Sequence, residues 1–179
     1  MDEIVKRALI KWPDVPHCFG WLGLDARGQW YMRDEHVQTL GNFASSKGKR
    51  LEHTKLVAFI SRNYQADALG QWFFQNGPQR VYVELELSPW VWRIQHKENH
   101  FELLSHTGLQ TSLEHCFQDE TGLLYLKTAL GFGLVHTMDM WQAAQMLEFG
   151  PYQTTEITQK EMAQTFGFVL SPMAHHKNH

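Results

Sequence analysis

Apolar and polar residues alternate most strictly between residues 80 and 87. Every second residue there is apolar, and the polar residues between them are Arg80, Tyr82, Glu84 and Glu86. A period of two is typical of a half-buried strand with one solvent-exposed face. Residues 90–95 continue the alternation, and Trp90 and Trp92 share a face that we expect to complete a core. The runs 19–24 and 123–128 also fit strands.

Four segments have the three-to-four-residue spacing of an amphipathic helix. The first carries a stripe of Ile4, Ala8, Leu9 and Trp12 and ends at Pro13, and the second covers residues 56–64. The third begins near Thr137, whose hydroxyl can cap it, and ends at Gly150-Pro151. The fourth begins with the capping box of residues 158–161 and ends at Gly167.

One local pattern, D-x-x-G followed by an apolar and an aromatic position, occurs three times. The copies begin at Asp25, Asp67 and Asp119. An Asp at the first position of a type I turn accepts backbone N–H bonds, and the Gly takes the left-handed conformation. The first and third copies predict hairpins with a bulge, and the second predicts a turn from a helix into a strand.

A longer repeat predicts two similar halves. His17-Cys18-Phe19 precedes the first of these turns, and His115-Cys116-Phe117 precedes the third. The polar stretch 96–101 lies between them, and domain boundaries fall in polar linkers. We therefore expect an N-terminal half over 1–97, a C-terminal half over 98–174 and a mobile tail over 175–179. Helices and strands do not alternate regularly, so the expected fold is α+β, with antiparallel β-meanders and packed helices in each half.

These residues carry a resemblance. The stretches 12–22, 25–34, 70–93, 119–139 and 166–172 are similar to a family of uncharacterised, proteobacterial-type proteins, a domain of unknown function. The most specific stretch reads WFFQNGPQRVYVELELSPWVWR. The resemblance implies a bacterial cytoplasmic protein with one architecture, and it transfers no catalytic residue. A fainter similarity to a second uncharacterised family implies fold alone.

Charge and hydropathy exclude several classes of protein. The chain has 16 Lys and Arg against 19 Asp and Glu, a formal net charge of -3, which argues against a nucleic-acid binder. The longest run without polar residues, 129–135, is far too short to span a membrane. The N-terminus has no signal-peptide pattern, so we expect Cys18 and Cys116 to be free thiols in the cytoplasm.

Strong catalytic and cofactor motifs are absent from the sequence. His17, Cys18, His115 and Cys116 are ligand types that zinc prefers, but neighbouring residues on a strand point to opposite faces. One His-Cys dipeptide therefore rarely supplies two ligands. We expect no metal and no cofactor.

The polar face of strand 80–87 is the best candidate for a ligand site. It contains Arg80, Tyr82, Glu84 and Glu86, and we expect Arg93 on the adjacent strand. The alternative interpretation is a solvated ladder of paired charges. No residue is identified as catalytic.

Three classes of function follow from this sequence. The first is a non-catalytic binding or interaction module for a small molecule or a protein. The second is a small enzyme that uses Glu84 or Glu86 as acid–base and Arg93 to bind an anionic substrate. The third is a structural subunit that forms a homodimer through its aromatic surface.

Overall fold

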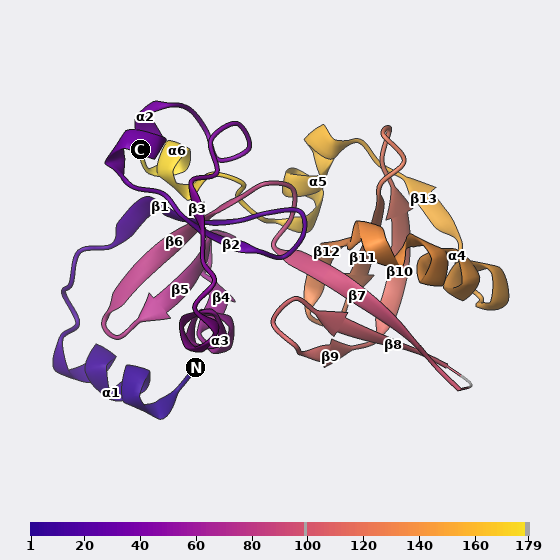
Figure 1. Cartoon of the computed structure of the whole chain (residues 1–179), viewed down its shortest axis with the longest axis horizontal. Helices are drawn as coiled ribbons and strands as arrows, with labels where there is room; N and C mark the ends of the chain where they lie inside the picture. Colours follow the sequence, from indigo (N-terminus) through magenta and orange to yellow (C-terminus); the bar gives the residue numbers. More distant parts are fainter. Residues whose placement is uncertain (99, 178–179) are drawn as a thin grey trace. The chain divides into compact units, whose positions relative to one another are not determined.

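The computed structural model describes residues 1–98 and 100–177, which form two compact units (Figure 1). Unit 1 contains Met1–Asp25, Gln29–Glu86 and the described chain from Gly167 on, and unit 2 contains Ala26–Gly28 and Leu87–Phe166. Each unit has its own sheet and its own helices. The predicted α+β class is confirmed.

Unit 1 is built on a six-stranded sheet. In sheet order its strands are β3 (Lys49–Arg50), β2 (Trp30–Met32), β1 (Cys18–Leu24), β6 (Gln79–Leu85), β5 (Trp72–Asn76) and β4 (Tyr64–Ala66). Its helices are α1 (Glu3–Lys11), α2 (Glu35–Thr39), α3 (Thr54–Arg62) and α6 (Pro172–Lys177). α6 packs against β6 and β1, so the C-terminal segment covers the centre of the sheet.

Unit 2 is built on a seven-stranded sheet. In sheet order its strands are β13 (Thr154–Glu156), β10 (Leu113–Gln118), β11 (Leu124–Thr128), β12 (Gly131–Val135), β7 (Trp90–Lys97), β8 (His100–Ser105) and β9 (Gln110–Thr111). Its helices are η1 (Thr137–Asp139), α4 (Met140–Phe149) and α5 (Gln159–Phe166). Only Ser112 separates β9, at one edge, from β10, near the other edge. The sheet is therefore strongly curled, and its two ends approach each other.

The sheets are mixed, whereas the sequence predicted antiparallel meanders. Three pairs are parallel: β1 with β6, β7 with β12, and β10 with β13. Parallel neighbours need a long connection between them. The chain between β1 and β6 contains such a connection, made of two hairpins and α3. Because its strands and helices do not alternate regularly, the sequence did not predict a parallel pair.

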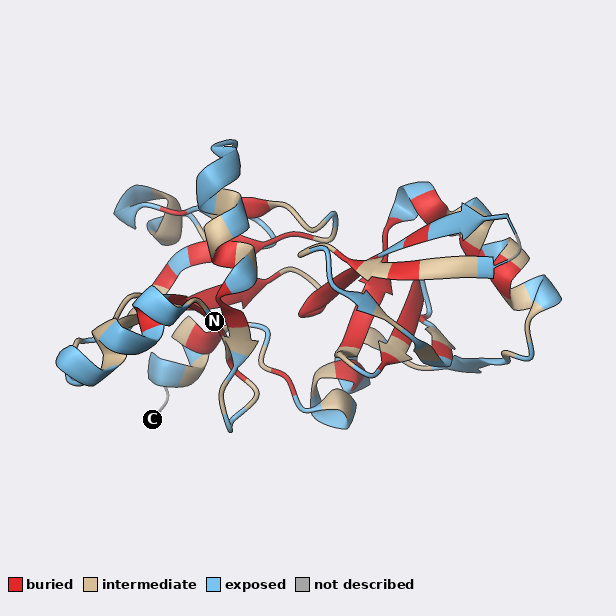
Figure 2. Cartoon of the chain, turned by 90° about the horizontal axis from the view of Figure 1, so that it is seen from below, coloured by how far each residue is buried: buried red, intermediate tan, exposed pale blue. Residues whose placement is uncertain are grey.

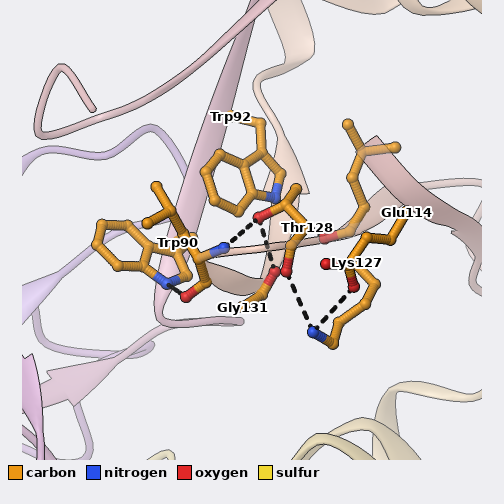
Figure 3. A network of polar contacts seen from close by, with 8 residues as sticks. Trp90, Trp92, Glu114, Lys127, Thr128 and Gly131 are labelled. Atoms are coloured by element: carbon orange, nitrogen blue, oxygen red, sulfur yellow. Dashed lines mark hydrogen bonds and ion pairs between the residues drawn. The ribbon is translucent and has the colours of Figure 1, made fainter. Parts of the chain in front are cut away.

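The core of unit 2 is aromatic, as the alternation of residues 90–95 predicted. Trp90 is 5% exposed and Trp92 is fully buried, and Figure 2 shows that the buried positions concentrate in the strands. The two indole N–H groups donate to the carbonyl oxygens of Leu130 and Leu126, at 2.9 and 3.1 Å (Figure 3). Gly133 lies so close to the Trp90 backbone that an added Cβ would clash with it.

All three D-x-x-G sequences form turns, and the first and third lie where the sequence predicted them. In each, the Asp carboxylate accepts the N–H four residues on, at 2.8 or 2.9 Å, and the Gly has a positive φ. The second copy joins β4 to β5, so it closes a hairpin and does not lead directly from a helix. Ser105 makes a fourth turn of this kind, between β8 and β9, in which its hydroxyl accepts the Leu109 N–H at 3.0 Å.

The units divide at a different place from the one predicted. The expected boundary at 97/98 lies inside the β7–β8 hairpin, whose strands pair from Trp92 with Ser105 to Lys97 with His100. Residues 96–98 and 100–101 form the end of that hairpin, and one division between the units comes between residues 86 and 87. Of the predicted tail, residues 175–177 complete α6, and 178–179 lie outside the described residues.

The predicted apolar stripe of the first helix is also wrong. Val5 is the buried residue of α1, whereas Ile4 and Trp12 are exposed.

In the described chain, no helix is both long and apolar enough to cross a membrane.

Both cysteines are free, as expected, but they differ in access. Cys18 is partly exposed and Cys116 is buried. Burial raises the pKa of both thiols, that of Cys116 to about 11. Because the thiolate is the reactive form, we expect a thiol reagent to modify one cysteine in the native protein and two after denaturation. Cys18→Ser should leave no reactive thiol in the native state, and two equally fast thiols would contradict the burial of Cys116.

Candidate functional site

The five predicted site residues belong to two different units. Arg80, Tyr82, Glu84 and Glu86 belong to unit 1, whereas Arg93 lies on β7 in the sheet of unit 2. The expected exposed face does not form either, because Tyr82 and Glu84 are only 4% and 2% exposed.

Glu84 anchors the C-terminal helix of unit 1. Its carboxylate accepts hydrogen bonds from the Ser171 hydroxyl at 2.5 Å and from the Met173 N–H at 3.0 Å. Burial raises the pKa of this carboxyl, against the lowering effects of these hydrogen bonds and of the charge on Arg33. The Glu84 carboxylate therefore holds the N-terminus of α6 and is shielded from solvent.

The other three residues of this group also have structural partners. The Tyr82 hydroxyl donates to the Asp67 carboxylate at 3.1 Å. The Arg80 guanidinium lies 4.6 Å from the centre of the Phe73 ring. Glu86 pairs with Lys47 at 2.7 Å.

Arg93 binds a carboxylate of its own unit. Its Nε and Nη2 donate to the two oxygens of Asp139 at 2.6 and 3.0 Å, and the Ile94 N–H donates to the same carboxylate at 3.0 Å. Burial raises the pKa of Asp139, but these hydrogen bonds outweigh it, and the pKa is lowered. The acid–base hypothesis pairs Arg93 with Glu84, whereas in the structure Arg93 binds Asp139 of its own unit.

The two His-Cys dipeptides belong to different units. His17-Cys18 belongs to the sheet of unit 1, and His115-Cys116 to that of unit 2. Over residues 1–98 and 100–177, no three His, Cys, Asp or Glu side chains come together in a group that could hold a metal ion.

Unit 2 contains a hollow of about 680 Å³ that the sequence did not reveal. It lies between the end of the β7–β8 hairpin, the β9–β10 junction and the C-terminal part of α4. Its lining comprises His96, His100, Phe101, Leu103, Thr111, Ser112, Leu113, Gln145, Met146, Phe149, Gly150, Pro151 and Tyr152. This volume is within the range of about 300–1,000 Å³ that is typical of small-molecule sites.

The curled sheet explains why these residues meet. His96, Phe101 and Leu103 share one face of the hairpin, because His96 pairs with Phe101 and Ile94 with Leu103. Thr111 pairs with Leu103 and extends that face to the sheet edge. Met146 on α4 is buried, and it closes the hollow on the helical side.

Thr111 carries an unusual feature for a residue of the hollow wall. Its hydroxyl oxygen is buried and has no hydrogen-bond partner among the described residues. A buried polar group that is left unpaired costs about 1–3 kcal/mol. A ligand group that reaches this hydroxyl would supply the missing hydrogen bond.

Replacing the unpaired hydroxyl should therefore stabilise the protein. We expect Thr111→Val to raise the free energy of unfolding by about 1 kcal/mol in urea titrations. Thr128→Val is the matched control, because the Thr128 hydroxyl accepts the Leu130 N–H and donates to the Gly131 carbonyl, at 3.1 and 3.2 Å (Figure 3). That control should lose about 1–3 kcal/mol. Equal losses in both variants would show that the Thr111 hydroxyl has a partner.

A signal for the hollow was present in the sequence. The alternation that places Trp90, Trp92 and Ile94 on one face continues to His96. Phe101 and Leu103 alternate in the same way on the next strand. The polarity of residues 96–101 predicts a linker. In the structure, residues 96–98 and 100–101 instead belong to a hairpin, and one face of this hairpin borders the hollow.

Two solved structures align with most of the chain. One is a DUF1285 family protein from Silicibacter pomeroyi DSS-3, with a TM-score of 0.49, 11% identity and coverage of 74% of this chain and 73% of that chain. The other is a DUF1285 family protein from Shewanella baltica OS155, with a TM-score of 0.49, 14% identity and coverage of 73% and 93%. No curated protein matches the sequence significantly. The family model described as "Protein of unknown function (DUF2946)" matches residues 1–173, and the chain belongs to this family.

Proposed function

We propose that the protein is a non-catalytic binding module and that unit 2 holds a small, largely apolar molecule in its hollow. The observation that carries this proposal is the composition of the wall, which combines six large apolar or proline side chains with six polar side chains. Ligand sites typically have this mixture, because apolar contacts supply affinity and placed polar groups supply orientation. The curl of the sheet supports the proposal, since it forms the concave surface from backbone geometry.

The proposal extends to where the protein works. We propose a bacterial cytoplasmic protein, since both cysteines are free and thiols stay reduced in the cytoplasm. The acid–base alternative requires Glu84 and Arg93 to act together on one substrate. It has less support than the binding module, because Glu84 and Arg93 bind different partners in different units.

One observation favours the dimerising alternative. Met138, Trp141 and Phe149, on η1 and α4, are each more than 70% exposed. Large contiguous patches of exposed apolar side chains mark interaction surfaces, and these three residues are the candidates for such a patch. Sedimentation of the wild type and of Trp141→Ala over a range of concentrations tests this alternative. A concentration-dependent dimer that the variant loses would favour it, and a monomer at all concentrations would exclude it.

Filling the hollow tests the main proposal. Ser112 is exposed and small, and it borders the hollow, so Ser112→Trp places a large ring there. We expect this variant to abolish the thermal shift produced by any apolar compound that stabilises the wild type. A bound ligand stabilises by mass action, about 2.7 kcal/mol at one hundred times its Kd.

Gln110→Trp is the control for this experiment. Gln110 is exposed on the same strand as Thr111 and does not border the hollow. It should keep the thermal shift. A thermal shift that survives in Ser112→Trp would place the site elsewhere. A series of alkyl compounds gives a second test, because each buried methylene contributes about 0.8 kcal/mol to binding. An affinity that does not rise with chain length would contradict an apolar site.

A further inference from the structure

The polar side chains that border the hollow share one chemical property, which is that each can donate a hydrogen bond. They are His96, His100, Thr111, Ser112, Gln145 and Tyr152. An imidazole keeps at least one N–H in every protonation state, and amide and hydroxyl groups also donate. No carboxylate belongs to the lining within the described chain. An ammonium head group would therefore find no counter-charge in the wall, whereas a carboxylate would find several donors.

The hollow also has a polar end and an apolar end. Leu103 and Met146 are 4% and 6% exposed and form its inner part. His96 and His100 are exposed at the end of the hairpin, and both border the hollow. The His96 ring lies 4.8 Å from the Phe101 ring, which joins the two ends. An amphipathic molecule fits this gradient with its apolar body over Leu103 and Met146 and its head group beside the imidazoles.

The charges near the imidazoles are compatible with an anionic head group. The nearest carboxylate in an ion pair is that of Glu102, 3.8 Å from His100 Nε2. It does not border the hollow, and the Lys97 ammonium lies 3.7 Å from it and offsets its charge. The exposed end of the hairpin therefore presents the imidazole donors and the Lys97 ammonium together with two acids, Glu98 and Glu102, neither of which borders the hollow.

From these observations we propose that the ligand is an amphipathic carboxylate, with an aliphatic or aromatic body and one carboxylate group. This proposal rests on the proposed function, since it assigns the chemical class of the molecule that the hollow binds. The carboxylate accepts N–H bonds from His96 and His100, and the body replaces water over Leu103 and Met146.

Three probes of equal chain length separate the head group from the body. Decanoate, decan-1-ol and decylamine are titrated calorimetrically into the full-length chain near neutral pH, below their micelle concentrations. We expect decanoate to bind at least tenfold more tightly than decylamine and severalfold more tightly than decan-1-ol. Binding of decylamine as tight as that of decanoate overturns the proposal.

Variants of the two imidazoles give the second readout. The double variant His96→Ala/His100→Ala should weaken decanoate at least fivefold and change decan-1-ol less than twofold. The double variant His96→Gln/His100→Gln retains N–H donors and should recover part of the decanoate affinity. Equal weakening of both probes in the alanine variant contradicts a head-group role.

The outcomes distinguish this proposal from the proposed function. If decan-1-ol binds, Ser112→Trp abolishes that binding and decanoate shows no preference, the hollow is a ligand site and the carboxylate assignment fails. If none of the probes binds, or if all bind equally well to Ser112→Trp, the hollow itself is not the site and both proposals fail.

Discussion

Replacing Arg33 by methionine should lower the free energy of unfolding of unit 1 by about 3–5 kcal/mol. The Arg33 side chain is fully buried, and its guanidinium donates to the carbonyl oxygens of Gly41 and Ser46 at 2.7 and 3.0 Å. Methionine matches the aliphatic part but leaves these carbonyls unpaired in the interior. Urea unfolding of the variant, followed by circular dichroism, measures the loss.

Arg50→Met is the matched control for Arg33. The Arg50 side chain is about half exposed, pairs with exposed Glu52 at 2.8 Å and makes a longer hydrogen bond to the Gln29 side chain at 3.5 Å. Exposed ion pairs contribute about 0–1 kcal/mol, so this variant should remain close to the wild type. A small loss in Arg33→Met, similar to that of the control, would mean that the 34–48 segment does not depend on the buried guanidinium.

Glu84→Ala should cost about 2–4 kcal/mol, although the sequence placed Glu84 on a solvated face where the cost would be small. Alanine leaves the Ser171 hydroxyl and the Met173 N–H without their acceptor, and it removes the negative charge that attracts Arg33. We expect hydrogen exchange to rise first in residues 172–177. The matched control is Glu52→Ala, at an exposed position. A cost below about 1 kcal/mol would restore the interpretation as a surface ladder.

The same carboxyl predicts a pH dependence. Its pKa is raised, with burial as the largest cause. The folded protein therefore binds this proton more tightly than the unfolded chain does. The contribution of protonated Glu84 to the free energy of unfolding is fully present below the ordinary glutamate pKa. It is lost as pH rises through the folded-state pKa of this carboxyl.

Glu84→Gln resembles the protonated form and removes this titration. The difference in unfolding free energy between this variant and the wild type should therefore shift in favour of the variant as pH rises from about 4 to about 8. A shift in the opposite direction would show that the fold prefers the ionised carboxylate.

Features that depend on neighbouring residues could be predicted from the sequence. The Asp of each D-x-x-G turn bonds a backbone group only four residues away, so Asp25, Asp67 and Asp119 all behave as expected. The alternation over residues 90–95 identified the buried face of Trp90 and Trp92 for the same reason. These signals are local, and no other part of the chain overrides them.

Features that depend on distant residues could not be predicted. The alternation at Tyr82 and Glu84 is real, but α6, which begins 88 residues after Glu84, covers that face. Six residues are too few for a periodic pattern, so nothing in the sequence announced this cover. Arg33 is similar, because its acceptors come from segments whose backbone geometry the residue types do not specify.

The sequence did not predict the hollow of unit 2, for a related reason. The charged residues of strand 80–87 and Arg93 suggested a ligand site on those strands. In the structure Arg93 pairs with Asp139, which the sequence indicated only as a favourable charge in the first turn of a helix. The hollow arises from the curl that brings β9 beside β10. Curl depends on strand order, which the alternation of residues does not contain.

The division of the chain has a consequence for its synthesis. Unit 2 consists of the continuous segment Leu87–Phe166 and the short turn Ala26–Gly28. Unit 1, in contrast, needs both its early strands and the segment from Gly167 on. Leu85 on β6 donates its N–H to Leu170, and Val169 donates to Gly70, so the last part of unit 1 pairs with strands made long before. On the ribosome, the later unit can therefore finish folding first. The earlier strands must wait, with the centre of their sheet uncovered, until residues 167–177 have left the exit tunnel, and this interval is when a chaperone would be most useful to the protein.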